Sequence, residues 1–155
     1  MRDAIGGVVN LVIIVVFMVI VSGYLAFNVN YTKAFRVKNK IISTIEEYEG
    51  NMSNSALQEQ ITNYMRSIGY DRSQNLNCSS YDMKDGAGGG YCYKQVRTNS
   101  SGAGEDEGNV KVYYKVITQI QIDIPIIRNI MPYFKFFTVS GDTRAIKINS
   151  SYLEG

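Results

Sequence analysis

The stretch VVNLVIIVVFMVIVSGYLAF, residues 8–27, decides the fold. It contains one internal amide, Asn10, and no charged residue occurs between Ala4 and Thr32. A helix that crosses the hydrocarbon core of a bilayer needs about 20 mostly apolar residues, and it satisfies its own backbone hydrogen bonds there. We therefore predict a transmembrane helix over residues 1–32.

A cleaved secretory signal is the alternative interpretation of this stretch. The apolar core of such a signal is only about 7–15 residues long, and a small-residue cleavage site follows it. Residues 27–31, FNVNY, offer no such site. The sequence therefore favours a helix that is retained.

The helix is predicted to continue beyond the membrane through residues 33–50. No proline or glycine precedes Gly50 in this segment, and its apolar residues recur at helical spacing. Gly50 is the predicted terminating residue. We expect the apolar stripe to pack against a head domain formed by residues 51–155, through Ala34, Val37, Ile41 and Ile45.

A second, short amphipathic helix is predicted after residue 54. Ser55 followed three residues later by Gln58 matches a capping box, and Gly69 is the expected stop. The apolar residues Leu57, Ile61 and Met65 lie at helical spacing between these ends. A stripe of this kind is more typical of a packed core than of a groove-binding helix.

Residues 109–124 show the clearest strand pattern in the chain. Apolar residues occupy alternate positions, with Thr118 as the one break, which predicts a sheet with one buried face and one wet face. The long helix is the expected cover for the buried face, through Val110, Val112, Tyr114, Val116, Ile120 and Ile122. Shorter strands are predicted at 91–98, 133–139 and 143–148, the last two as a hairpin turning at Ser140-Gly141-Asp142. The predicted class is α+β.

The composition argues against catalysis and against nucleic-acid binding. The chain of 155 residues has a net charge of +2, and its cations form no run beyond the membrane boundary. It has no histidine, which removes the usual general base and the commonest metal ligand. We therefore expect no enzymatic activity, no cofactor and no metal. The 12 tyrosines suggest a contact surface, with Tyr91, Tyr93 and Tyr113 as exposed contact points.

The two cysteines, Cys78 and Cys92, are read either as a disulfide or as reduced thiols of a cytosolic domain. The choice depends on topology. Lys33, Arg36 and further lysines follow the apolar span, which by the positive-inside rule places the head in the cytoplasm. The cysteine pair and a head rich in Tyr, Ser, Asn and Gly favour the outside, and we expect a head outside the cytoplasm with the disulfide formed.

This layout resembles that of the type IV pilins and their relatives, including the tight-adherence pilins and the pseudopilins. An apolar amino-terminal helix runs on into an amphipathic half, and a small sheet with two cysteines follows. Residues 122–146, IDIPIIRNIMPYFKFFTVSGDTRAI, also look like the carboxyl ends of small membrane-anchored pilin-like proteins of low-GC bacteria. The resemblance implies a subunit of an extracellular filament or of a pilus-assembly apparatus.

The chain departs from the pilin pattern at its amino terminus. Pilins have a short basic leader that ends in glycine and a glutamate at the fifth mature position. Here Arg2 is the only basic residue before Gly6 and Gly7, and cleavage after Gly7 would place Val12 at position five. No processing site is therefore carried over. Asp3 is the only acid in this region that could pair with a neighbour's amine.

The filament hypothesis assigns helix packing to one set of residues: Val9, Leu11, Ile14, Val15, Met18, Val21, Ser22, Gly23 and Leu25. Ser22 and Gly23 would permit close approach of helices. The implied partners are the membrane, further copies of this chain, a secretion ATPase and a membrane platform protein. A monomeric single-pass adaptor or sensor, whose head binds a partner, is the alternative hypothesis.

Overall fold

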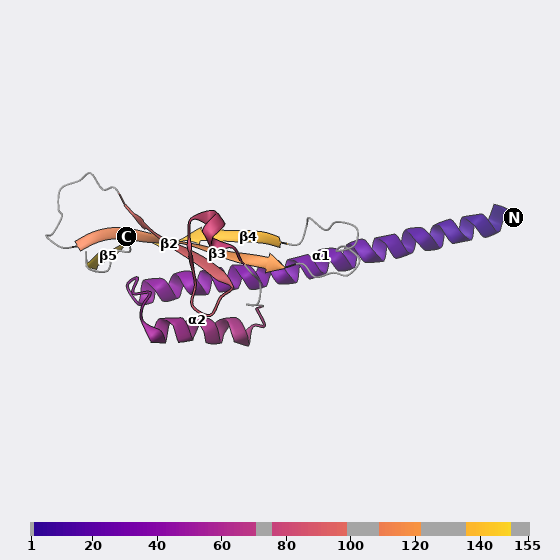
Figure 1. Ribbon diagram of the computed structural model, residues 1–155. Coiled ribbons are helices and arrows are strands. Elements are labelled where there is room, and N and C mark those ends of the chain that lie inside the picture. The colour runs from indigo at the N-terminus through magenta and orange to yellow at the C-terminus, as the bar shows by residue number, and fades with distance from the viewer. Residues whose placement is uncertain (1, 71–75, 99–108, 122–135, 150–155) are drawn as a thin grey trace.

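The computed structural model describes residues 2–70, 76–98, 109–121 and 136–149 (Figure 1). A single helix, α1 (Arg2–Glu47), leaves the head as a rod at its N-terminal end. Its C-terminal half lies between a short helix, α2 (Ser55–Ser67), and an antiparallel sheet. The α+β class is confirmed, with a long apolar helix, a second short helix and a small antiparallel sheet.

The end of α1 is built around Gly50. The backbone N–H of Gly50 donates to Ile45 O at 2.9 Å, and Gly50 has a φ of 76°. A Cβ atom on Gly50 would lie 2.8 Å from Cε2 of Tyr114, whose hydroxyl donates to Gly50 O at 2.8 Å. Glycine is required here because both the positive φ and the close ring exclude a side chain. The predicted termination at Gly50 is thus explained, with the last helical residue at Glu47.

The predicted capping box at the start of α2 is wrong. Ser55 is the first helical residue, and the N-cap is Asn54, whose Oδ1 accepts from Ala56 N at 2.9 Å. Gln58 instead donates through Nε2 to Met52 O at 3.0 Å. Asparagine is as good an N-cap as serine, and its position one residue earlier determines where the helix begins. α2 then runs back along α1 to its C-cap at Ile68.

The sheet is organised around its longest strand, β3 (Asn109–Gln121). One edge of β3 pairs with β2 (Tyr91–Arg97), which also pairs with the two-residue β1 (Lys84–Asp85). The other edge pairs with both β4 (Phe136–Asp142) and β5 (Ile146–Asn149). A short 3₁₀ helix, η1 (Cys78–Tyr81), precedes β1. All of these pairings are antiparallel.

The core between α1 and the sheet contains those predicted core residues whose side chains the structure describes. Ala34, Val37, Ile41 and Ile45 are at most 1% exposed, and so are Val112, Tyr114 and Val116. Val110 is half-buried and packs against this core. Thr118, the break in the alternation, is also buried, and its hydroxyl oxygen lies 3.2 Å from Ala34 O, to which it donates. The hydroxyl is therefore tolerated because the helix supplies an acceptor.

The predicted hairpin between the last two strands is wrong. Ser140, Gly141 and Asp142 lie within β4, and β4 and β5 both pair with β3 one after the other. The register changes between Lys115↔Asp142 and Val112↔Ile146, so three residues, 143–145, stand opposite two of β3. This is the geometry of a β-bulge, in which one extra residue is left without a ladder partner.

Several predictions fall outside the described residues. They are Ile122 as a core residue, the start of the strand predicted at 133–139, and the continuation of the long strand beyond Gln121. The backbone of Ile120 lies in β3, and its side chain is not among those described.

Candidate functional site

The N-terminal half of α1 presents a bare apolar surface. The hydrophobic side chains from Val8 to Met18 are between 51% and 64% exposed, on every face of the helix. By length and composition α1 can cross a membrane. Such a surface is costly in water, at about 25 cal/mol per Å² of apolar area, so it requires lipid or other helices as surroundings. This surface is the candidate functional site.

The structure places all of the predicted helix-packing residues except Gly23 on the exposed surface of α1. Val9, Leu11, Ile14, Val15, Met18, Val21, Ser22 and Leu25 are exposed, and Gly23 is buried. The helix continues through Gly23 without interruption. The backbone of Asp3 lies in the first turns of α1, and its side chain is not among those described.

An aromatic row marks the junction between the apolar rod and the head. Phe27 stacks on Tyr31 with centroids 6.1 Å apart, and Tyr31 stacks on Phe35 at 6.3 Å. Phe137 of β4 meets Phe27 edge-on at 5.8 Å, and Lys38 Nζ lies 4.3 Å from the centroid of the Phe35 ring. Aromatic and cationic side chains are enriched at the interface between lipid and water. The junction therefore has the chemistry of a membrane boundary.

The disulfide lies on the outer face of the sheet, which is the face opposite α1, and covers part of it. Cys78 and Cys92 are bonded, with Cα atoms 5.5 Å apart, and both are buried. They pack with Ile117, which faces away from α1, and with the half-buried Leu76 and Met83. The alternative of two reduced thiols is not what the structure contains. Sequence reasoning missed Ile117, because the alternation in residues 109–124 predicts a wet face on that side of the sheet.

An exposed ion pair also links the C-cap of η1 to β2. Lys94 Nζ bonds the Asp82 carboxylate, and this hydrogen bond lowers the pKa of Asp82 below its usual value. Pairs exposed in this way contribute little to stability. A shallow cavity of about 520 Å³ beside the pair is lined by Tyr93 and Gln95 among other residues.

The tyrosines predicted as exposed contact points are mostly covered. Tyr91 is 1% exposed and its ring lies over Gly86, where a Cβ atom would be 2.1 Å from the ring. Burial raises the pKa of Tyr91 to about 12. Tyr93 and Tyr113 are half-buried in the sheet. The interpretation of Tyr91 as a contact residue is therefore wrong, because alternation places its side chain on the α1 side of β2, beside Thr118.

Within the described residues, the one cluster with metal-ligand spacing combines Asp85 with Cys78 and Cys92. Because both sulfurs are joined in the disulfide, neither offers the thiolate that a soft metal binds. The arrangement therefore supports no metal site.

Comparisons with known proteins give no relative. No family model matches the chain, and no curated protein or solved structure matches it.

Proposed function

We propose that this chain is a structural subunit of a pilin-like filament or of its assembly apparatus, joined to its neighbours through the N-terminal half of α1. The observation that carries the proposal is the division of this helix. Ile41 and Ile45 are at most 1% exposed beneath the sheet, while Ile13 is 61% and Met18 62% exposed. The head buries the C-terminal half of α1 and leaves its N-terminal half exposed. This arrangement suits a subunit in which other copies of the chain cover the exposed half.

The proposed cycle starts with storage of the subunit in the membrane. Extraction of an apolar helix of about 20 residues from lipid costs on the order of tens of kcal/mol. Packing of the same helices in a fibre core offsets that cost, with work from a motor ATPase. The disulfide supports a head outside the cytoplasm, because structural disulfides persist in oxidising compartments. No catalytic role is proposed for a chain without histidine.

A monomeric single-pass adaptor is the second candidate. Lys33, Arg36 and Lys38 directly follow the apolar stretch, and positive charge after a span favours a cytoplasmic head. In that case the apolar half of α1 would remain in lipid permanently.

The deciding experiment is electron microscopy of sheared cell-surface fractions, with mass spectrometry of the fibres. The filament proposal expects fibres that contain this chain. Finding it only as isolated monomers, both in detergent and in sheared fractions, would favour the adaptor. Reaction of a single introduced cysteine at the exposed Asn63 with an impermeant reagent on intact cells tests the side of the membrane.

A further inference from the structure

A shallow groove lies on α1 where the apolar run gives way to the first cations. It has a volume of about 510 Å³. Leu25 and Val29 line its apolar end, Lys33 and Arg36 line its cationic end, and Ile68 at the cap of α2 forms a side wall. Both apolar side chains are more than half exposed. The groove therefore presents an amphipathic surface to whatever surrounds the helix at this level.

The groove lies at the depth of the lipid headgroups if residues 8–27 fill the hydrocarbon core. Lys33 follows Phe27 by six residues, which places it about 9 Å further along the helix axis. Side chains of a helix lean toward its N-terminus, so Lys33 and Arg36 lean back toward the bilayer. The two cations are thus within reach of headgroup phosphates, and Leu25 remains at the level of the acyl chains.

The groove lies on a face of α1 that is distinct from the face under the sheet, and α2 borders it only through Ile68 and Gly69 among the described residues. Ala34, Val37 and Ile41 face the sheet, and the row from Phe27 to Phe35 occupies a second face. Leu25, Val29, Thr32 and Arg36 follow one another at intervals of three or four and form a third face, and Asn28 and Lys33 flank it. Its polar floor is already satisfied, since Asn28 Nδ2 donates to Tyr24 O at 2.9 Å and Thr32 Oγ1 to Asn28 O at 2.8 Å.

The cationic end of the groove lies beside α2, and its two charges have no ion-pair partner among the described residues. A Cβ atom on Gly69 would lie 3.9 Å from Lys33 Nζ, so this ammonium sits beside the C-terminal turn of α2. The negative end of a helix dipole favours a cation at this position. Within the described part of the chain, the ion pairs are Lys94–Asp82 and Arg144–Glu46, and neither involves Lys33 or Arg36. Both charges are therefore without a carboxylate partner among the described residues, and an anionic ligand of the groove would meet both of them.

We propose that this groove binds an anionic phospholipid, with the headgroup phosphate between Lys33 and Arg36 and one acyl chain along Leu25 and Val29. The proposal rests on α1 spanning a membrane, as the proposed function also requires. The bound lipid would fix the height of the head above the bilayer while the subunit is stored.

The test uses the full chain in detergent with phosphatidylglycerol or phosphatidylcholine of identical acyl chains, and native mass spectrometry counts the lipids retained. Each cation near a lipid surface contributes about fivefold to affinity, so we expect roughly a twenty-five-fold preference for phosphatidylglycerol from the two cations. The double variant K33Q/R36Q should lose this preference. The exchange variant K33R/R36K should keep it, and so should K111Q/K147Q, whose two lysines are exposed and paired across β3 and β5.

Three results would overturn the proposal: equal retention of both lipids by the wild type, an undiminished preference in K33Q/R36Q, or an equal loss in K111Q/K147Q. Cross-linking between chains through a cysteine placed at Thr32 would instead assign the groove to a second copy. Flotation with pure phosphatidylcholine vesicles separates this proposal from the proposed function. If the chain fails to float, both the proposed function and the lipid-binding proposal are wrong. If it floats but retains both lipids equally in mass spectrometry, only the lipid-binding proposal is wrong.

Discussion

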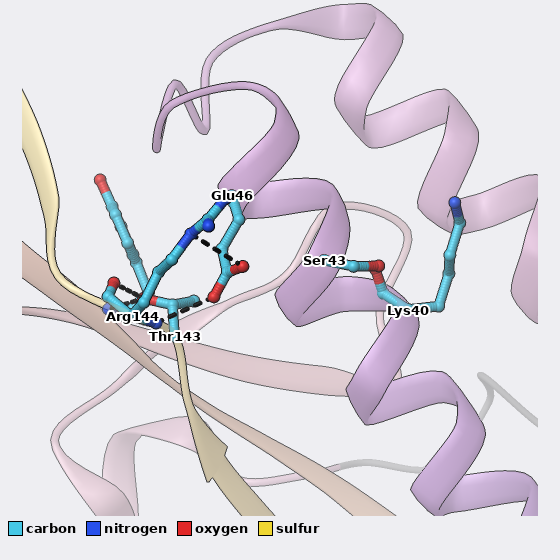
Figure 2. A network of polar contacts seen from close by, with 6 residues as sticks. Lys40, Ser43, Glu46, Thr143 and Arg144 are labelled. Carbon is cyan, nitrogen blue, oxygen red and sulfur yellow. Dashed lines mark hydrogen bonds and ion pairs between the residues drawn. The ribbon is translucent and has the colours of Figure 1, made fainter.

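Glu46 of α1 binds Arg144 through both of its carboxylate oxygens. Oε1 accepts from the backbone N–H of Arg144 at 2.9 Å, and Oε2 lies 3.2 Å from its Nε atom (Figure 2). Arg144 belongs to the bulge between β4 and β5, where its N–H has no partner in the sheet ladder. Glu46, in the last turn of α1, therefore supplies the hydrogen-bond acceptor that the sheet does not provide for the backbone N–H of Arg144.

We predict that Glu46→Ala lowers the free energy of unfolding of the head by about 1–2 kcal/mol, because it removes a charged acceptor from a backbone donor. Arg144→Ala should cost at most about 0.5 kcal/mol, since its side chain is 75% exposed and the N–H remains. Chemical denaturation in detergent micelles, followed by tyrosine circular dichroism, measures both. Glu47→Ala, at an exposed neighbouring carboxylate, is the control. Equal losses in Glu46→Ala and Glu47→Ala would contradict the contact.

Gly50→Ala is expected to destabilise the head more than Gly69→Ala. Both residues have positive φ, 76° and 63°, so each alanine bears backbone strain of about 1–2 kcal/mol. The added methyl meets the Tyr114 ring at 2.8 Å at position 50, and only Lys33 Nζ at 3.9 Å at position 69. Overpacking should add about 1–3 kcal/mol in Gly50→Ala. Thermal unfolding of the two variants makes the comparison, and a smaller loss in Gly50→Ala would be inconsistent with the packing.

Loss of the disulfide is predicted to cost about 3 kcal/mol of stability in the chain-entropy model, since it joins residues 14 apart. The variant C78S/C92S should unfold at a lower denaturant concentration than the oxidised wild type. Reductant should lower the wild type toward the variant and leave the variant unchanged. A reductant effect of equal size on both proteins would show that the disulfide is not its target.

The buried Tyr91 predicts a loss of stability at high pH. Burial raises the pKa of Tyr91 to about 12 in the folded head, against 10.0 for the free side chain. Below pH 10 both states hold the proton and the contribution is complete. As the pH rises from about 10 to 12, the unfolded chain ionises first, and stability falls by roughly 2–3 kcal/mol. Tyr91→Phe should show a shallower decline than the wild type across this window in pH-dependent denaturation, and parallel curves would refute the assignment.

The helix–sheet architecture could be predicted because two simple periodicities dominate it. The stripe from Ala34 to Ile45 follows the helical period, and Val112, Tyr114 and Val116 follow the period of a strand. Each pattern predicts which face of its element is buried, and the two buried faces pack against each other in the structure. The local order of residues was sufficient to predict this packing because both the helix and the strand are long.

The bulge and the outer face of the sheet could not be predicted in this way. Ser140-Gly141-Asp142 has turn chemistry, but the 13-residue β3 is long enough to pair with two segments in succession. The extra residue is accommodated because Thr143 Oγ1 accepts from Tyr114 N at 2.9 Å and Glu46 accepts from Arg144 N. These partners are 29 and 98 residues apart in the chain, beyond the reach of a local pattern. Ile117 is buried for a similar reason, by the disulfide-linked η1.

The central claim is that copies of this chain meet through the exposed half of α1. A photo-crosslinking residue at Val15, in the native cell membrane, tests it most directly, with the same residue at the exposed Asn63 of α2 as control. The account predicts a ladder of cross-linked dimers, trimers and larger species of this chain from position 15, and a much weaker ladder from position 63. Only monomers and lipid adducts from position 15, in cells that express the protein, would contradict it.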